Sequence, residues 1–148
     1  MKIREAVRLD IPEIMAIRLA VKENQLSDPS TVTYDLCLDY LTRWGKGWVC
    51  EIDSKVVGFS IVDMQEKNVW ALFLDSNFEG KGIGRKLLFT LLDWYFKQTE
   101  DPIWLGTSPG TRAASFYQKF GWRHVGKHGD QEIKFELSYA EWQDLNPI

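Results

Sequence analysis

The sequence predicts a mixed α/β domain in which helices lie on both faces of a twisted, mostly antiparallel central sheet. Two strand-like runs flank the turn Asp53-Ser54, as in an antiparallel hairpin. Farther along, a strand pattern, a long helical pattern and a second strand pattern follow one another, as in a crossover between parallel strands. A length of 148 residues suits one domain with a substantial core. We therefore expect residues 1–148 to form a single domain.

The first third of the chain is expected to contain one strand and two short helices. Residues 3–8 alternate as a strand does, and Asp10 followed by Pro12 is a typical helix start. Apolar residues return at helical spacing over residues 36–44. Residues 24–33, between the helices, are rich in Ser, Asp, Pro and Thr, so they form either the wall of a pocket or a plain surface loop.

The middle of the chain is expected to form a meander of three strands, then a long helix and a fourth strand. The helix carries one apolar stripe and ends before Asp101-Pro102, because the residue before a proline disfavours helix. These elements are expected, in order, at residues 47–53, 55–64, 69–74, 83–98 and 103–107.

The last third is expected to add a helix, a hairpin and a final helical segment. Pro109-Gly110-Thr111 opens the helix and Gly121 ends it. Ser138 and Glu141 have the spacing of a capping box at the start of the final segment. The two strands of the hairpin, its turn and the final segment are expected at residues 122–127, 132–137, 128–130 and 138–145.

The composition excludes several classes of partner. A net charge of −3 and a pI near 5.4 give no basic field of the kind that nucleic-acid binding needs. No stretch approaches the roughly 20 apolar residues of a membrane span, so we expect a cytoplasmic protein that binds neither nucleic acid nor membrane. Cys37 and Cys50 have no metal-type spacing, which favours two buried thiols over a disulfide or a metal site.

The most informative stretch joins the strand at residues 69–74 to the helix at residues 83–98. Gly80, Gly82 and Gly84 alternate there, and a helix start stripped of side chains exposes N–H groups that hold phosphate. The spacing matches neither a Walker A loop nor the Gly-x-Gly-x-x-Gly dinucleotide fingerprint. A glycine turn without a ligand explains one glycine better than three. We therefore expect a phosphate-bearing ligand at this loop.

Two segments resemble the GNAT superfamily of N-acetyltransferases. After a strand, the family has Arg or Gln, any two residues, Gly, any residue, and then Gly or Ala. Residues 79–84, Glu-Gly-Lys-Gly-Ile-Gly, follow that pattern except for Glu79, and a carboxylate near phosphate should lower the affinity. Residues 110–122 resemble the family's later helix, with Gly110 in place of Asn and Trp122 in place of Phe.

The resemblance covers nearly the whole chain and implies an N-acetyltransferase with acetyl-CoA as cosubstrate. In that reaction a primary amine of a small molecule or peptide attacks the thioester directly in a ternary complex. The resemblance is also compatible with a homodimer, and a non-catalytic acyl-CoA-binding or regulatory module is the alternative. The residues that it implies for acetyl-CoA binding are Leu72, Phe73, Leu74, Glu79, Gly80, Lys81, Gly82, Ile83, Gly84 and Arg85.

Tyr117 occupies the family position of the acid that protonates the leaving CoA thiolate. A phenol with an ordinary pKa near ~10 is protonated at neutral pH and is well matched to an alkyl thiol. Spacing alone favours a packing role for Tyr117 over the role of an acid, since Tyr117 shares an apolar stripe with Phe116 and Phe120. The general base is left unassigned. Its candidates are Glu51, Asp63 and Glu66, which are typical of solvated charges, and His124 and His128, which are typical of surface histidines.

The acceptor amine is expected to approach from the side of residues 24–33. Trp44, Trp70 and Trp104 are candidate walls of its pocket, although tryptophans at such positions are more often core. A net charge of −3 is too small to favour a cationic acceptor over a neutral one.

Overall fold

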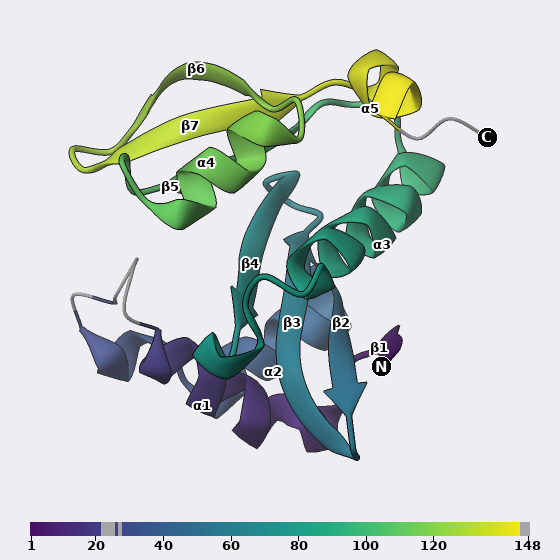
Figure 1. Cartoon of the computed structure of the whole chain (residues 1–148), viewed down its shortest axis with the longest axis vertical. Coiled ribbons are helices and arrows are strands. Elements are labelled where there is room, and N and C mark those ends of the chain that lie inside the picture. Colours follow the sequence, from purple (N-terminus) through teal and green to yellow (C-terminus); the bar gives the residue numbers. More distant parts are fainter. Residues whose placement is uncertain (22–25, 27, 146–148) are drawn as a thin grey trace.

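A seven-stranded sheet runs through the computed structural model of the chain, which describes residues 1–21, 26 and 28–145 (Figure 1). The strands are β1 Lys2–Glu5, β2 Gly45–Ile52, β3 Lys55–Asp63, β4 Asn68–Leu74, β5 Ile103–Thr107, β6 Arg123–His128 and β7 Glu132–Leu137. Their order is β1-β2-β3-β4-β5-β7-β6, and only the pair β4 and β5 is parallel. The predicted mostly antiparallel sheet, its β2–β3 hairpin and its parallel crossover are confirmed.

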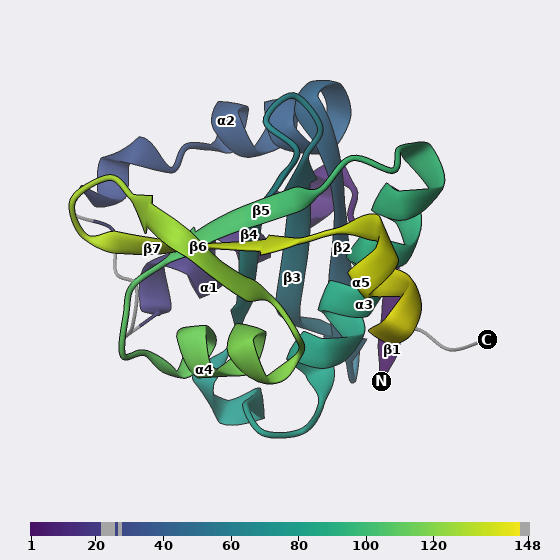
Figure 2. The same ribbon diagram turned by 90° about the horizontal axis from the view of Figure 1, so that it is seen from above.

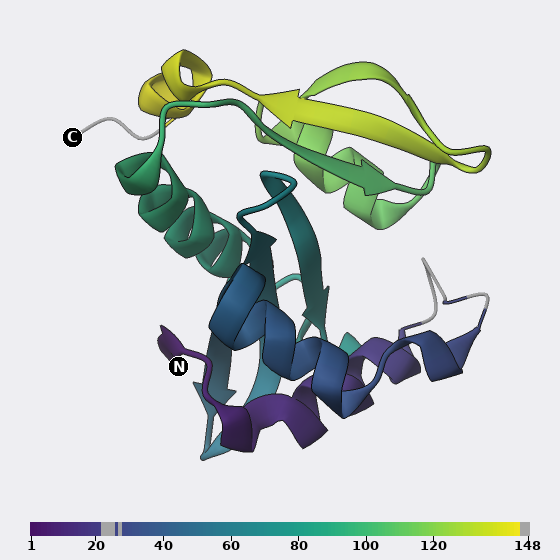
Figure 3. The same ribbon diagram turned by 180° about the vertical axis from the view of Figure 1, so that it is seen from behind.

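Helices cover both faces of the sheet, as predicted. They are α1 Ile11–Ala20, α2 Tyr34–Asp39, α3 Ile83–Gln98, α4 Arg112–Lys119 and α5 Tyr139–Leu145. α1 and α2 lie behind the strands in Figure 1 and in front of them in Figure 3, whereas α3 lies on the opposite face. The view from above shows α4 and α5 on the same side as α3 (Figure 2). None of the helices in the described part of the chain is long and apolar enough to cross a membrane.

Two hydrophobic cores hold the helices to the sheet. The larger core lies against α3, whose predicted apolar stripe is buried. In the smaller core, Ile14 and Ile17 of α1 pack with Phe59 of β3. Cys37 and Cys50 are buried free thiols, as predicted, and burial raises the pKa of both.

The first strand ends at Glu5, earlier than predicted, because Asp10 turns the chain. Its carboxylate accepts the Val7 N–H at 2.8 Å and two N–H groups of the Arg4 guanidinium, each at 2.9 Å. A 3₁₀ turn, Arg8–Asp10, then leads directly into α1. The strand prediction was therefore too long at its carboxyl end.

Other local predictions are confirmed with small changes. The helix predicted at residues 36–44 is α2 followed by a π-helical turn, Tyr40–Trp44. The Ser138 N–H donates to the Glu141 carboxylate and the Glu141 N–H donates to the Ser138 hydroxyl, which is the predicted capping box. The predicted loop at residues 24–33 lies partly outside the described residues, and its described part contains a 3₁₀ turn, Pro29–Thr31.

Asp10→Asn is expected to lower the free energy of unfolding at neutral pH by about 1.5–3 kcal/mol, the contribution of hydrogen bonds to charged groups. Burial raises the pKa of the Asp10 carboxyl, but hydrogen bonds from Arg4 and Val7 outweigh it and hold that pKa below its usual range. This stabilisation is therefore complete above the unfolded-state pKa of about 4 and is lost as the pH falls through the folded-state pKa. Urea unfolding from neutral pH to about pH 2 measures both effects.

Asp93 provides the control for this experiment. Its carboxylate forms an exposed ion pair with Lys97 at 2.9 Å on the surface of α3. Asp93→Asn should change the stability much less, because exposed pairs contribute little. If Asp10→Asn kept the full acid sensitivity of the unmodified chain, the Asp10 carboxylate would not be its source.

β4 and β5 meet at one end only. Within the described chain, their parallel pairing is confined to Asn68 and Trp104, which lie near the first residues of the two strands. The strands separate toward their carboxyl ends (Figures 1 and 2). The register between β3 and β4 shifts around Trp70, and such a β-bulge bends the strand. One edge of β4 is therefore left without a neighbouring strand just before the glycine loop.

Candidate active site

A cleft of about 1300 Å³ opens where β4 and β5 separate. Its walls come from α1, β4, the glycine loop, the start of α3, β5, α4 and the β6–β7 hairpin. Lys81 does not line it, and the Lys81 Nζ lies 5.5 Å from the centre of the Phe78 ring. The other predicted site residues do line it: Leu72, Phe73, Leu74, Glu79, Gly80, Gly82, Ile83, Gly84, Arg85 and Tyr117.

Two backbone amides of β4 face this cleft. In an antiparallel ladder, successive N–H groups point alternately to the two sides of the strand. The Asp75 N–H donates to the Val57 carbonyl oxygen at 2.8 Å, so the Phe73 N–H also faces β3. The N–H groups of Leu72 and Leu74 therefore face the edge from which β5 has separated. They are donors for a carbonyl oxygen placed in the cleft.

The glycine loop ends in a helix start without a side-chain cap. Gly80 and Gly82 have φ of 76° and 81°, in the left-handed region that favours glycine, and Gly82 is the N-cap of α3. The first N–H groups of a helix have no partner within it. Here they belong to Ile83, Gly84 and Arg85, which line the cleft. With the positive end of the helix dipole, these N–H groups form an arrangement that favours an anion such as phosphate.

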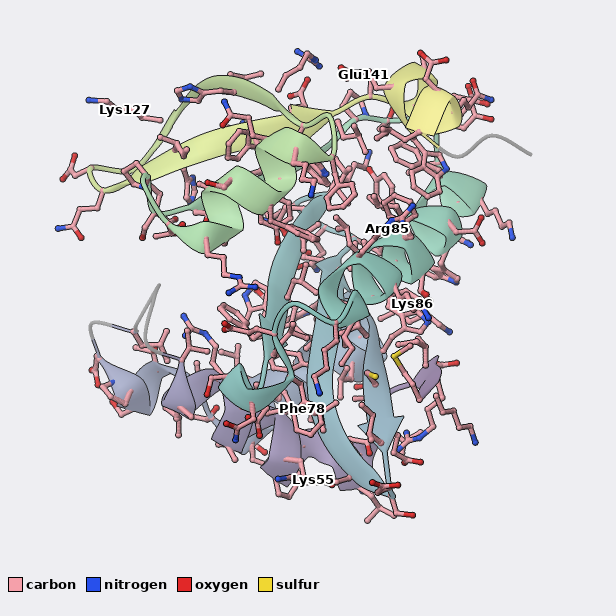
Figure 4. All side chains as sticks on the ribbon, in the orientation of Figure 1. Lys55, Phe78, Arg85, Lys86, Lys127 and Glu141 are labelled. Carbon is pink, nitrogen blue, oxygen red and sulfur yellow. The ribbon has the colours of Figure 1, made fainter. Side chains whose placement is uncertain are left out.

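The two basic residues that follow the loop lie on different sides of α3 (Figure 4). The Arg85 guanidinium lies 5.2 Å from the centre of the Phe89 ring and 5.7 Å from that of the Phe120 ring, toward α4. Lys86 lies on the outer side of the helix and does not line the cleft. Arg85 is therefore the better placed of the two for contact with a phosphate.

Glu79, which departs from the family pattern, faces a cation. Its Oε2 lies 3.3 Å from the Nη1 of Arg112, the first residue of α4. Arg112 also reaches over the loop, since a Cβ added to Gly80 would lie 3.5 Å from its Nη2. α4 therefore places a positive charge beside the carboxylate that would otherwise repel a phosphate.

Tyr117 is packed and also lines the cleft. Its residue is 6% exposed, and its ring centre lies 5.3 Å from that of Phe116 and 5.6 Å from that of Trp122. Burial raises the pKa of its phenol above the ordinary value. A phenol with a raised pKa stays protonated, which is the form that a general acid needs. The packing and the acid interpretations of Tyr117 are therefore compatible.

The carboxylates considered as the base lie outside the cleft. Asp63 accepts the N–H groups of Gln65 and Glu66 at 2.8 and 3.1 Å. The Glu51 carboxylate accepts a hydrogen bond from the Arg4 guanidinium at 2.9 Å. Neither of these acids lines the cleft, and Glu66 does not line it either.

Three residues of the β6–β7 hairpin line the cleft, although sequence reasoning placed none of them there: His128, Gln131 and Glu132. The Nε2 of His128 lies 3.9 Å from the Oε1 of Glu132, and its ring centre lies 4.9 Å from that of Trp104. The side chain of His128 is 48% exposed, in agreement with a surface histidine, but the hairpin brings it to the cleft. Trp70 and Trp104 also line the cleft, whereas Trp44 does not.

The comparison with protein families agrees with this geometry. The chain matches the model of the Acetyltransferase (GNAT) family over residues 13–122, well over half of its length. The chain belongs to the GNAT acetyltransferase family.

Solved structures share the fold of this GNAT domain. The ribosomal-protein-alanine N-acetyltransferase of Brucella melitensis has a TM-score of 0.77 at 21% identity, with 93% of this chain and 99% of that chain covered. The PaiA N-acetyltransferase of Thermoplasma acidophilum, in complex with coenzyme A, has a TM-score of 0.79 at 18% identity, with 93% and 98% covered. At these identities the likeness shows the fold alone.

A curated relative of this GNAT domain is the N-acetylaspartate synthetase of Xenopus tropicalis. It is 36% identical over 84 residues, which are 53% of this chain. The chain spans only 31% of the length of that relative.

Arg112→Gln is expected to weaken CoA binding to this GNAT domain by about twofold to fivefold, since Glu79 is then unpaired beside the phosphate and exposed pairs contribute up to about 1 kcal/mol. Glu79→Gln should tighten binding, because it removes the negative charge beside the phosphate. The double variant should return close to the unmodified affinity. Isothermal titration of CoA at low and high salt measures these effects, which shrink at high salt.

The control for this cycle is Lys97→Gln, which removes an exposed cation of α3 that does not line the cleft. Its CoA affinity should stay unchanged. An unchanged CoA affinity in both Arg112→Gln and Glu79→Gln would show that neither charge acts on the phosphate.

Proposed function

We propose that this GNAT domain is an N-acetyltransferase that moves the acetyl group of acetyl-CoA to a primary amine of a small molecule or peptide. The observation that carries this proposal is the composition of one cleft. The free β4 amides, the uncapped glycine-rich start of α3 and a buried, protonated tyrosine all line it. These are the donors that a thioester carbonyl, a pyrophosphate and a leaving thiolate each require.

In the proposed reaction, the amine nitrogen forms a bond to the thioester carbon in a ternary complex. The N–H groups of Leu72 and Leu74 stabilise the oxygen that gains negative charge. The C–S bond then breaks with its electron pair on sulfur, and the Tyr117 hydroxyl gives its proton to that sulfur. The first-turn amides of α3 hold the pyrophosphate and so fix the thioester against β4.

An amine that attacks must also lose a proton, and the cleft limits the groups that could receive it. Glu13 and Asp75 each accept a backbone N–H, and Glu79 faces Arg112. The Nε2 of His128 and the Oε1 of Glu132 lie 3.9 Å apart, too far for a hydrogen bond, and the His128 ring also packs against Trp104. We assign the proton acceptor to this pair, directly or through one water.

Acetyl-CoA and a panel of amino acids, polyamines, aminoglycosides and peptides test the proposal. We expect saturable CoA binding by calorimetry and a release of CoA thiol that depends on one class of amine. The position of Glu79 favours one other candidate function, a non-catalytic acyl-CoA-binding module. CoA binding without turnover on any amine would support that module and contradict the enzyme, and absence of CoA binding would contradict both.

A further inference from the structure

Arg18, near the carboxyl end of α1, lines the cleft on the side away from the glycine loop helix. Its guanidinium carbon lies 4.3 Å from the centre of the Phe73 ring, so the cation rests against the face of an aromatic side chain of β4. Phe73 packs in the smaller core with α1, whereas Leu72 and Leu74 pack in the larger core with α3. Arg18 therefore lies on the opposite face of β4 from the expected pyrophosphate site.

The guanidinium of Arg18 has no close anionic partner among the described residues. Its Nη1 is buried and donates no hydrogen bond to them. Burial lowers the pKa of Arg18, and the charge of Glu132, acting through space, opposes this. Arginine nevertheless stays charged at neutral pH. Arg18 as a residue is half-buried, and a partly desolvated cation of this kind is costly unless an anion compensates it.

Three of the carboxylates that line the cleft have other partners. Glu13 accepts the N–H of Val56 at 3.0 Å, and Glu79 faces Arg112 at 3.3 Å. Asp75 accepts a backbone N–H at 2.9 Å within its own turn. Glu132, the remaining carboxylate of the lining, acts on Arg18 only through space, so a carboxylate that enters the cleft would be its close ionic partner.

The geometry of Arg18 fits a carboxylate. The planar guanidinium presents parallel N–H donors that match the two oxygens of a carboxylate. The Phe73 ring lies against the guanidinium, with its centre 4.3 Å from the guanidinium carbon, and so restricts the position of the cation. Across the cleft, Glu132 and His128 supply the opposite charge and the proton acceptor that an ammonium group needs. Arg18 on one side and the pair of His128 and Glu132 on the other would therefore fit a zwitterion, which carries a carboxylate and an ammonium group.

We propose that Arg18 binds a carboxylate of the acceptor, so that the amine acetylated by this chain belongs to an amino acid or a similar small molecule carrying both groups. This inference rests on the proposed acetyl transfer. It makes Arg18 a specificity residue that contacts the acceptor and leaves acetyl-CoA binding to the glycine loop.

The test compares each amino acid with its carboxamide, which keeps the amine and removes the negative charge. At saturating acetyl-CoA, kcat/KM for the preferred acid should exceed that for its amide by about 30-fold or more, the effect of one unpaired, partly buried charge. Arg18→Met should remove that preference by raising KM for the acid, while rates on the amide and CoA affinity stay unchanged. Arg18→Lys should restore part of it. Arg43→Met is the matched control, because Arg43 also rests on an aromatic ring, at 5.8 Å, but does not line the cleft.

The outcomes separate this inference from the proposed function. Equal rates on acid and amide in the unmodified protein would overturn the role of Arg18 and leave acetyl transfer standing, and this comparison needs no variant to fold. A loss of CoA affinity in Arg18→Met, with its thermal unfolding unchanged, would assign Arg18 to CoA and overturn the inference as well. CoA binding without turnover on any amine would overturn the proposed function and the inference together.

Discussion

With phenylalanine in place of Tyr117, kcat is expected to fall about 100-fold to 1000-fold, while the Kd of acetyl-CoA stays within about twofold. The substitution removes the proton proposed for the leaving thiolate and keeps the ring that packs against Phe116 and Trp122. Binding should persist, because the amides of β4 and of the α3 start are untouched. Steady-state thiol release and isothermal titration of acetyl-CoA measure the two quantities.

Tyr95→Phe is the matched control for this substitution. Tyr95 is also fully buried, but its hydroxyl donates to the Asp101 carbonyl oxygen at 3.1 Å, and it does not line the cleft. Loss of the Tyr95 hydroxyl should lower the free energy of unfolding by about 1 kcal/mol and leave kcat unchanged. Full turnover by Tyr117→Phe would remove Tyr117 from the mechanism.

The pH dependence of kcat provides a second measurement of the same assignment. Burial raises the pKa of the Tyr117 phenol, so the acid keeps its proton beyond the ordinary phenol pKa of about 10. Any change of kcat between about pH 6 and pH 9 must then come from the amine or from the group that accepts its proton. The same change of kcat with pH should persist in Tyr117→Phe, at a lower absolute rate.

Local patterns predicted most of the fold because they act over a few residues. The turn at Asp53-Ser54, the stripe of α3 and the cap at Ser138 all depend on near neighbours in the sequence, and the structure confirms each of them. The end of β1 was missed because it depends on a network of Asp10, Arg4 and Glu51, only part of which is local in the sequence. Arg4 is shared between Asp10 and Glu51, and no local pattern shows that contact.

The site also combines a feature that depends on consecutive residues with features that depend on distant segments. The glycine loop could be identified from residues 80–84 alone, since a helix start and its glycines are consecutive. Arg112, which faces Glu79, comes from a later helix. Arg18 and His128 reach the cleft from α1 and the β6–β7 hairpin, and only the assembled sheet brings them to β4 and β5. No spacing in the sequence links these groups, so the base and the acceptor side could not be predicted.

Gly82→Ala is expected to weaken acetyl-CoA binding about tenfold or more, which corresponds to about 1.4 kcal/mol. Gly82 is the N-cap of α3 with φ of 81°, and a Cβ added there would meet no protein atom within 4 Å. The protein therefore leaves this space open at the wall of the cleft, where the proposed pyrophosphate approaches the backbone. A methyl group would fill it. The left-handed backbone alone should lower the stability by about 1–2 kcal/mol.

Gly110→Ala separates these two effects. Gly110 also has a positive φ, 72°, and equally open space around an added Cβ, but it does not line the cleft. The two variants should therefore lose similar stability in urea unfolding, while only Gly82→Ala loses affinity in titration with acetyl-CoA. If both variants bound acetyl-CoA equally well, the start of α3 would not hold the pyrophosphate, and the glycines would be explained by the turn alone. A difference confined to Gly82→Ala would assign the open space above the loop to the ligand, because backbone strain is common to both variants.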